Sequence, residues 1–192
     1  TRTPALIAMP GRYRVAVDQK MVTSEDAILG GATEIALIPP VSGGGGPWVR
    51  LDHEPINSDL VLQAVHRPDC GAVLLFLGCV RDSYQGAVVE RIDYSAYESM
   101  ALAELQALAE EALVRLGQPS AVALWHRLGT VSAGEASVAV AVATPHRQAA
   151  YREGQWLIDT LKARVPIWKK EVGPDGAVWI EGDARVSSNQ ER

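Results

Sequence analysis

The chain has 192 residues, and its 47% apolar content is enough to bury the core of one main domain with a smaller appendage. Its net charge of −5 excludes the broad basic face that nucleic-acid binding requires. No apolar run reaches the roughly 20 residues of a membrane-spanning helix, and the N-terminus has no secretion signal. We therefore expect a soluble, cytoplasmic protein whose local basic clusters bind small anions or a partner protein.

Two short strands are predicted before residue 46. They are YRVAV (Tyr13–Val17) and EIALI (Glu34–Ile38), separated by the turn-forming run GGAT and followed by PPVSGGGG. So little structure cannot bury an independent core. This segment either packs against the main domain or lacks its N-terminal half.

The main domain is predicted to begin near Trp48 with a strand, followed by a helix that Ser58 caps. Next, Gly71–Val80 (GAVLLFLGCV) is a continuous apolar run, typical of a strand buried on both faces. Arg81 follows directly, and the end of such a strand is where open α/β sheets place ligand-binding groups. The alternative is an ordinary charge at a strand end.

The middle of the chain combines strands with one long helix. We expect a strand at Val88–Tyr97, a helix at Ser99–Leu116 capped by Gly117, and a hairpin of Ala121–Val131 with Glu135–Thr144. His126 lies inside the first hairpin strand, where a structural histidine is more frequent than a catalyst. Cys70 and Cys79 have no CxxC spacing or histidine cluster, so we interpret them as reduced structural cysteines and expect no metal site.

The strand that ends at Thr144 runs through Thr-Pro-His-Arg into a helix. Thr144 suits the N-cap and Pro145 the first helical position. The free backbone N–H groups and the helix dipole make such a terminus an anion site. His146 and Arg147 oppose the dipole in the first turn, so they destabilise the helix unless an anion binds there.

The segment LKARVPIWKKE (Leu161–Glu171) concentrates cations in an acidic protein. Pro166 ends the helix near Val165 and is followed by a strand, whose side chains alternate between two faces. Lys162 then lies in the last helical turn and Lys169 on the strand, close enough in sequence to line one pocket. Alternatively, the helical cations complement the helix dipole and the strand lysines mark a solvated edge.

One distance constrains the assembly. His146 and Lys162 stand at opposite ends of one predicted helix, ~24 Å apart at ~1.5 Å per residue. They cannot easily bind one small substrate within one subunit. We therefore expect a two-fold dimer in which His146 and Arg147 of one chain complete a pocket built by Arg81, Lys162 and Lys169 of the other.

Four motifs resemble the large, catalytic subunit of molybdopterin synthase over residues 48–182. They are, in order, GAVLLFLGCVRD, YSAYESMA, TPHR and LKARVPIWKK. The resemblance implies an α+β chain with an α/β hammerhead-type fold and a ferredoxin-like sheet-and-helix core. It also implies a homodimer that transfers sulfur from a carrier thiocarboxylate to cyclic pyranopterin monophosphate, giving molybdopterin. The motifs contain no ligand cluster, so we expect no cofactor.

In the resembled family, the two lysines of an LK-x-R-x-P-x-WK pattern are active-site residues. Here they are Lys162 and Lys169, which could stabilise oxyanions and move protons, because crowding by cations and desolvation lower a lysine pKa. Arginines contact phosphate oxygens bidentately, which suits a substrate with a cyclic phosphate. The predicted substrate-binding residues are Arg81, His146, Arg147, Arg164 and Lys170.

The pattern VAVDQ…GATEIALIPPVSGG resembles the C-terminal half of the small subunit, a ubiquitin-like β-grasp sulfur carrier, over residues 13–44. In that family the terminal Gly-Gly becomes a thiocarboxylate and enters the large subunit; the matching pair is Gly43 and Gly44, unless this run is only a flexible linker. We thus predict a fusion of a partial β-grasp segment (1–46), a catalytic domain (47–182) and a mobile tail (183–192). Because Gly44 does not end the chain, sulfur transfer requires cleavage after Gly44 or a separate carrier.

Two other kinds of function stay open. One is a non-catalytic dimeric scaffold that binds the tail of a β-grasp partner or a phosphate ligand. The other is a different phosphate-handling transferase on a ferredoxin-like frame, although the chain lacks a GxxxxGK[ST] nucleotide loop.

Overall fold

The computed structural model describes residues 14–17, 20–21, 35–38, 46–174, 176–181 and 184–185. The chain divides into two compact units, Thr1–Gly44 and Gly45–Arg192. In the first unit, β1 (Arg14–Val17) pairs antiparallel with β2 (Lys20–Met21) and with β3 (Ile35–Ile38). Both strands predicted in this unit are confirmed, and β2 adds a third.

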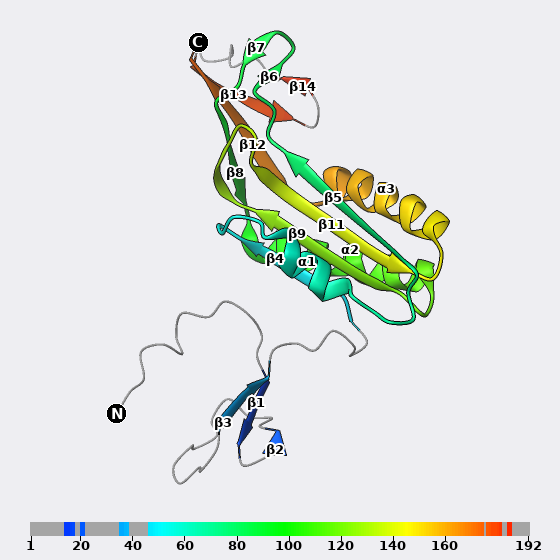
Figure 1. The fold of residues 1–192 in the computed structure, drawn as a ribbon. Coiled ribbons are helices and arrows are strands. Elements are labelled where there is room, and N and C mark those ends of the chain that lie inside the picture. Colours follow the sequence, from blue (N-terminus) through cyan, green and yellow to red (C-terminus); the bar gives the residue numbers. More distant parts are fainter. Residues whose placement is uncertain are drawn as a thin grey trace. The chain divides into compact units, whose positions relative to one another are not determined.

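A four-stranded sheet in the order β4-β9-β11-β5 lies at the centre of the second unit (Figure 1). Its strands are β4 (Trp48–Asp52), β5 (Ala72–Cys79), β9 (Ala121–Arg127) and β11 (Ala136–Thr144). β4 runs parallel to β9, and the other neighbouring strands are antiparallel. Because side chains alternate along a strand, the Val-Ala repeat of β11 gives the sheet one face of valines and one of alanines.

Helices cover both faces of this sheet. The short α1 (Ser58–Val65) packs on the alanine face, together with Trp125 of β9. The valine face is covered by α2 (Glu98–Leu116) and α3 (Arg147–Arg164). An ion pair joins these two helices, since Arg115 Nε lies 2.7 Å from Oε1 of the fully buried Glu153. No helix among the described residues is long and apolar enough to cross a membrane.

A second, antiparallel sheet has the order β10-β8-β12-β13-β14. Its strands are β8 (Arg91–Ala96), β10 (Gly129–Ser132), β12 (Ile167–Gly173), β13 (Gly176–Glu181) and β14 (Ala184–Arg185). A short hairpin, β6 (Ser83–Tyr84) with β7 (Ala87–Val88), precedes β8. The predicted α+β class is confirmed, and β14 lies in the segment predicted to be a mobile tail.

The position of β5 corrects one prediction. It is an edge strand, and Val73, Phe76 and Leu77 are 47%, 37% and 39% exposed. The run Gly71–Val80 is therefore not buried on both faces within one chain. Its composition instead provides an exposed apolar edge, which a protein that stays monomeric usually avoids.

Two further details differ from the expectations. The helix α1 is capped by Asn57, whose Oδ1 accepts from the Asp59 N–H at 2.9 Å, and Ser58 is its first residue. The predicted strand Ala121–Val131 is divided at Gly129, whose φ of 77° ends β9 and starts β10. The chain thereby crosses from the first sheet to the second.

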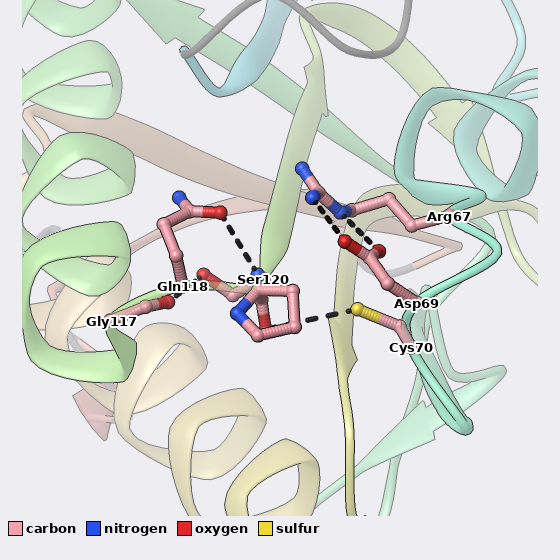
Figure 2. Close-up of polar contacts among 7 residues, drawn as sticks. Arg67, Asp69, Cys70, Gly117, Gln118 and Ser120 are labelled. Carbon is pink, nitrogen blue, oxygen red and sulfur yellow. Dashed lines mark hydrogen bonds and ion pairs between the residues drawn. The ribbon is translucent and has the colours of Figure 1, made fainter.

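Both cysteines are free. Cys70 precedes β5, and its Sγ lies 3.8 Å from the Pro119 carbonyl oxygen, in the loop before β9 (Figure 2). Burial raises the pKa of the Cys70 thiol, as expected for a structural cysteine. In the same cluster, the Ser120 hydroxyl donates to the Gly117 carbonyl oxygen and so closes the turn between α2 and β9.

Candidate functional site

Lys162 and Lys169 lie on either side of the turn that joins α3 to β12. The helix ends at Arg164, and the backbone N–H of its C-cap residue, Val165, donates to the Leu161 carbonyl oxygen at 3.0 Å. Pro166 follows, and β12 starts at the next residue. The predicted helix end and returning strand are confirmed, so Lys162 occupies the last turn of α3 and Lys169 the third position of β12.

The two lysines of β12 point to opposite faces of the second sheet. Lys169 is paired with Tyr94 of β8, and residues directly opposite in an antiparallel pair share a face. Tyr94 is buried, so Lys169 belongs to the inner face and is itself half-buried. Lys170 lies on the other face, where its Nζ is 5.7 Å from the ring centroid of Trp179.

Strand β5 brings Arg81 to the same end of the fold as Lys162. A Cβ on Gly71, just before β5, would lie 2.8 Å from the Pro145 carbonyl oxygen, so β5 starts beside the start of α3. Farther along, Leu74 contacts Gly154 in the middle of α3. Strand and helix therefore run side by side in the same direction, and β5 ends toward the C-terminal end of α3 (Figure 1). Arg81 follows β5 by two residues and so lies at that end.

The exposed guanidinium of Arg81 lies 5.1 Å from the ring centroid of Tyr84, a cation–π contact that holds it over the β6-β7 hairpin. The structure thus brings Arg81, Lys162 and Lys169 to one end of the second unit. These three cations form what we call the cationic end.

His146 and Arg147 lie at the other end of α3. His146, not Thr144, is the N-cap, and the helix starts at Arg147; Thr144 still belongs to β11. The Thr144 hydroxyl donates to the His146 carbonyl oxygen at 2.9 Å, within the segment between β11 and α3. Both His146 and Arg147 are exposed, and no side chain caps the first turn. Over the 18 residues of α3, the two ends are ~27 Å apart.

Arg164 has partners away from the cationic end. Its guanidinium lies 2.8 Å from Glu111 Oε2 and 3.4 Å from Glu104 Oε2, both on α2. The hydrogen bond to Glu111 and the charge of both carboxylates raise the pKa of Arg164. The structure thus gives this arginine a role in joining α2 to α3, and its part in substrate binding stays a prediction.

His126 is the structural histidine that the sequence predicts. Its Nδ1 lies 2.9 Å from the Arg127 carbonyl oxygen, and its ring packs edge-on against Tyr94, with centroids 5.2 Å apart. Burial, above all, lowers the pKa of His126 to about 4; the charge of Lys169 contributes to this shift, and the hydrogen bond to the Arg127 carbonyl oxygen opposes it. Tyr94 is the first residue of the YSAYESMA motif, and its burial between β8 and His126 gives it a packing role.

A groove of about 420 Å³ lies along the exposed edge, between β5 and α3. It is lined mainly by apolar side chains, and it lies midway along α3 rather than at the cationic end. Its lining residues are Leu74, Leu75, Phe76, Tyr151, Arg152, Gly154, Gln155 and Ile158.

The family model described as MoaE protein matches residues 51–164. The chain belongs to the MoaE family. The molybdopterin synthase catalytic subunit of Pyrococcus abyssi is 39% identical over 133 residues, which are 69% of this chain and 89% of that protein. The same subunit of Bacillus subtilis is 39% identical over 131 residues, covering 68% of this chain and 83% of the relative. The predicted resemblance to the large subunit is confirmed.

Solved structures agree with this membership. The crystal structure of molybdopterin synthase from Staphylococcus aureus superposes with a TM-score of 0.65 at 33% identity, covering 68% of this MoaE-family chain and 95% of that one. A complex of subunits 1 and 2 of molybdopterin-converting factor from Helicobacter pylori shares the fold, with a TM-score of 0.55 at 17% identity over 74% of this chain and 90% of that one.

The N-terminal unit matches a second family. The model described as ThiS family matches residues 2–44. This confirms the predicted fusion of a carrier-like segment to a MoaE domain. The match ends at Gly44, the second residue of the predicted thiocarboxylate pair, although Gly43 and Gly44 lie outside the described residues.

Proposed function

We propose that this chain is the catalytic part of a molybdopterin synthase, transferring sulfur from carrier thiocarboxylates to cyclic pyranopterin monophosphate. The observation that carries this proposal is the cationic end, where Arg81, Lys162 and Lys169 converge from three separate elements. In a MoaE-family member, these residues are the matches to the active-site motifs. Three cations suit a substrate that carries a cyclic phosphate and a reaction that passes through oxyanions.

The chemistry assigns a task to each kind of cation. The thiocarboxylate sulfur displaces an oxygen substituent from a substrate carbon and forms an acyl thioester, and the displaced oxygen leaves with a proton. Water then hydrolyses the thioester, so that the carrier leaves as a carboxylate and the sulfur stays on the substrate as a thiolate. A second carrier repeats the step at the neighbouring carbon. Arg81 binds the phosphate. Lys162 and Lys169 stabilise the oxyanion of the tetrahedral intermediate and transfer protons. We leave Arg164 out of this set because its guanidinium is bound by two carboxylates of α2.

A homodimer completes the site. Along α3, His146 and Arg147 are ~24 Å and ~22 Å from Lys162 of their own chain, so they can reach a cationic end only in another chain. The exposed apolar edge of β5 and the adjoining groove supply the surface for that contact, because burying Val73, Phe76 and Leu77 gains about 25 cal/mol per Å² of apolar area. A two-fold axis across this edge places the N-terminus of one α3 near the C-terminus of the other.

The sulfur carrier is a ThiS-like partner. The fold occurs in a two-subunit molybdopterin-converting complex, and the chain has its own ThiS-like segment. Because a thiocarboxylate needs a free terminal carboxyl group, that segment serves as carrier only after cleavage behind Gly44; otherwise a separate carrier supplies the sulfur. The intact mass of the protein from its native host distinguishes these two routes.

The test is dithiolene formation from cyclic pyranopterin monophosphate and a separately made thiocarboxylated carrier. We expect turnover by the parent chain, none by Lys162→Ala, and near-normal turnover by Arg67→Ala. The last is a matched control, because Arg67 is a cation at the opposite end of the sheet that pairs only locally with Asp69 at 2.7 Å. If the folded parent chain binds the carrier but shows no turnover, the proposed sulfur transfer is refuted and the non-catalytic dimeric scaffold is favoured.

A further inference from the structure

The residue directly before Arg81 is bound through both of its backbone polar groups. The Val80 N–H donates to the Glu135 carbonyl oxygen at 2.9 Å, and the Val80 carbonyl oxygen accepts from the Gly134 N–H at 2.8 Å. The Val80 side chain is 3% exposed and packs in a buried apolar cluster with strands of the second sheet. The place where Arg81 leaves the backbone therefore depends on the segment that binds Val80.

That segment is the turn between β10 and β11. The Glu135 N–H donates to the Ser132 carbonyl oxygen at 3.0 Å, which closes a four-residue turn. Gly134 is its third residue and has a φ of 88°, a value that type II turns require at this position and that glycine adopts without strain. We call the residues Ser132–Glu135 the anchor turn.

The surrounding backbone is also tied together. After Arg81, the Asp82 carbonyl oxygen accepts from the Val89 N–H at 2.8 Å. The anchor turn donates from the Ala133 N–H to the Glu90 carbonyl oxygen at 2.9 Å. Backbone hydrogen bonds thus hold the chain on both sides of the arginine, and the anchor turn takes part in this network.

Two side chains hold the anchor turn in shape. Oε2 of Glu135 accepts from the Ser132 N–H at 2.9 Å and lies 3.3 Å from Nη1 of Arg127, the last residue of β9. Nη2 of Arg127 donates to the Thr130 carbonyl oxygen of β10 at 3.2 Å. The hydrogen bond from the Ser132 N–H lowers the pKa of Glu135 most, and the charge of Arg127 adds to this shift, so the carboxylate stays ionised.

The side chain of Arg127 is more deeply buried than that of an ordinary surface arginine. It is 12% exposed, and its Nε has no hydrogen-bond partner among the described residues. A largely buried guanidinium costs free energy that its pairing only partly returns. Stability alone does not account for such an arginine, whereas a requirement for one fixed geometry of the anchor turn does.

We propose that Arg127 and Glu135 are positioning residues for Arg81. They fix the anchor turn, and the turn holds Val80 and thereby sets where the neighbouring guanidinium meets the phosphate. The inference rests on the proposed phosphate binding by Arg81. Neither positioning residue touches the substrate. A shift of the turn moves the root of the Arg81 side chain, and a charged hydrogen bond to phosphate depends on its distance and angle.

Two variants loosen the anchor turn. Glu135→Ala removes a side chain that is 44% exposed and leaves no buried cavity, and Arg127→Met removes the guanidinium but keeps an apolar side chain in its place. Glu135→Gln retains an oxygen that can accept from the Ser132 N–H and is the conservative variant. Asp69→Ala is the matched control, because Asp69 is 48% exposed, pairs with Arg67 at 2.7 Å and lies at the opposite end of β5 (Figure 2).

The measured quantity is the Kd of cyclic pyranopterin monophosphate, determined by titration calorimetry on the full chain. We expect Glu135→Ala and Arg127→Met to raise this Kd roughly fivefold, since a misplaced donor loses part of a charged hydrogen bond. Removing a carboxylate near a phosphate site would by itself lower the Kd, so the sign of the change in Glu135→Ala separates positioning from charge. Glu135→Gln should bind at least as tightly as the parent chain, and Asp69→Ala should bind like it. KM for the carrier should stay within about twofold in every variant.

A double-variant cycle completes the test. Arg81→Ala alone should raise the Kd more than about tenfold, and adding Glu135→Ala should then have no further effect, because the group that Glu135 positions is absent. The positioning role is overturned by an unchanged or lower Kd in folded Glu135→Ala or Arg127→Met, or by a full additional effect of Glu135→Ala beside Arg81→Ala. If Arg81→Ala itself binds normally, the proposed phosphate binding fails and the positioning role falls with it. Thermal unfolding checks that each variant is folded.

Discussion

A mixed dimer tests the division of the site between two chains. Arg147 begins α3 and Lys162 lies in its last turn, ~22 Å apart along the axis at ~1.5 Å per residue. A small substrate cannot contact both within one chain. In a dimer of one Arg147→Ala chain and one Lys162→Ala chain, one site carries both substitutions and the other carries neither. The mixed dimer should therefore have about half of the wild-type activity, although each homodimer is nearly inactive.

The assay uses co-expressed chains with two different affinity tags, so that tandem purification isolates only mixed dimers. Sulfur transfer per dimer is then compared with wild type and with each variant homodimer. A second mixed dimer, wild type with Arg147→Ala, gives the value for one intact site. If the double-variant dimer is no more active than the mean of the two homodimers, the two groups of cations do not share a site and the argument from helix length is wrong.

Three further predictions concern single side chains. Arg164→Ala should lower the free energy of unfolding by less than ~1 kcal/mol, because its ion pairs are exposed, and should leave kcat unchanged; a large loss of kcat would restore its predicted role. Phe76→Glu should give monomers in sedimentation velocity and abolish activity, because an unpaired charge buried in an interface costs ~3–5 kcal/mol; an active dimer would contradict this. His126 has a folded-state pKa of about 4 against an ordinary 6.5, so the unfolded chain binds its proton first. Its contribution to stability, of the order of 3 kcal/mol, is complete above pH 6.5 and lost as the pH falls to 4. In His126→Asn, the free energy of unfolding measured by urea denaturation should change less with pH between 6.5 and 4.

Much of the fold could be predicted because local signals agreed. Gly117 caps α2 as expected, and Pro166 ends α3 where a proline must. The caps at Asn57 and His146 were each assigned to a neighbour, since adjacent Asn-Ser or Thr-Pro-His residues offer several capping candidates. A hydroxyl bonded to a carbonyl, as in Thr144, cannot be recognised from the sequence.

The site could be predicted only in part, because its parts come together through long-range pairing. The motifs indicated Arg81, Lys162 and Lys169. The parallel packing of β5 along α3, and the turn from α3 into β12, place them at one end of the second unit. Nothing in the sequence indicated the ion pairs of Arg164, because Glu104 and Glu111 lie on another helix and only the packing of α2 against α3 brings them near.

The open edge of β5 connects assembly to catalysis. A strand that a partner chain buries has the same apolar composition as a strand buried within its own chain. For this reason the sequence of Gly71–Val80 predicted a central strand, although β5 lies at the edge of its sheet. That strand carries the proposed dimer surface at Phe76 and leads to Arg81, the proposed phosphate-binding group. The two residues are ~17 Å apart along an extended segment at ~3.3 Å per residue. A change in how the edge is covered therefore acts directly on the strand that positions Arg81. In the proposed dimer, one contact would bring His146 and Arg147 to the site of the other chain and also fix the strand that leads to Arg81.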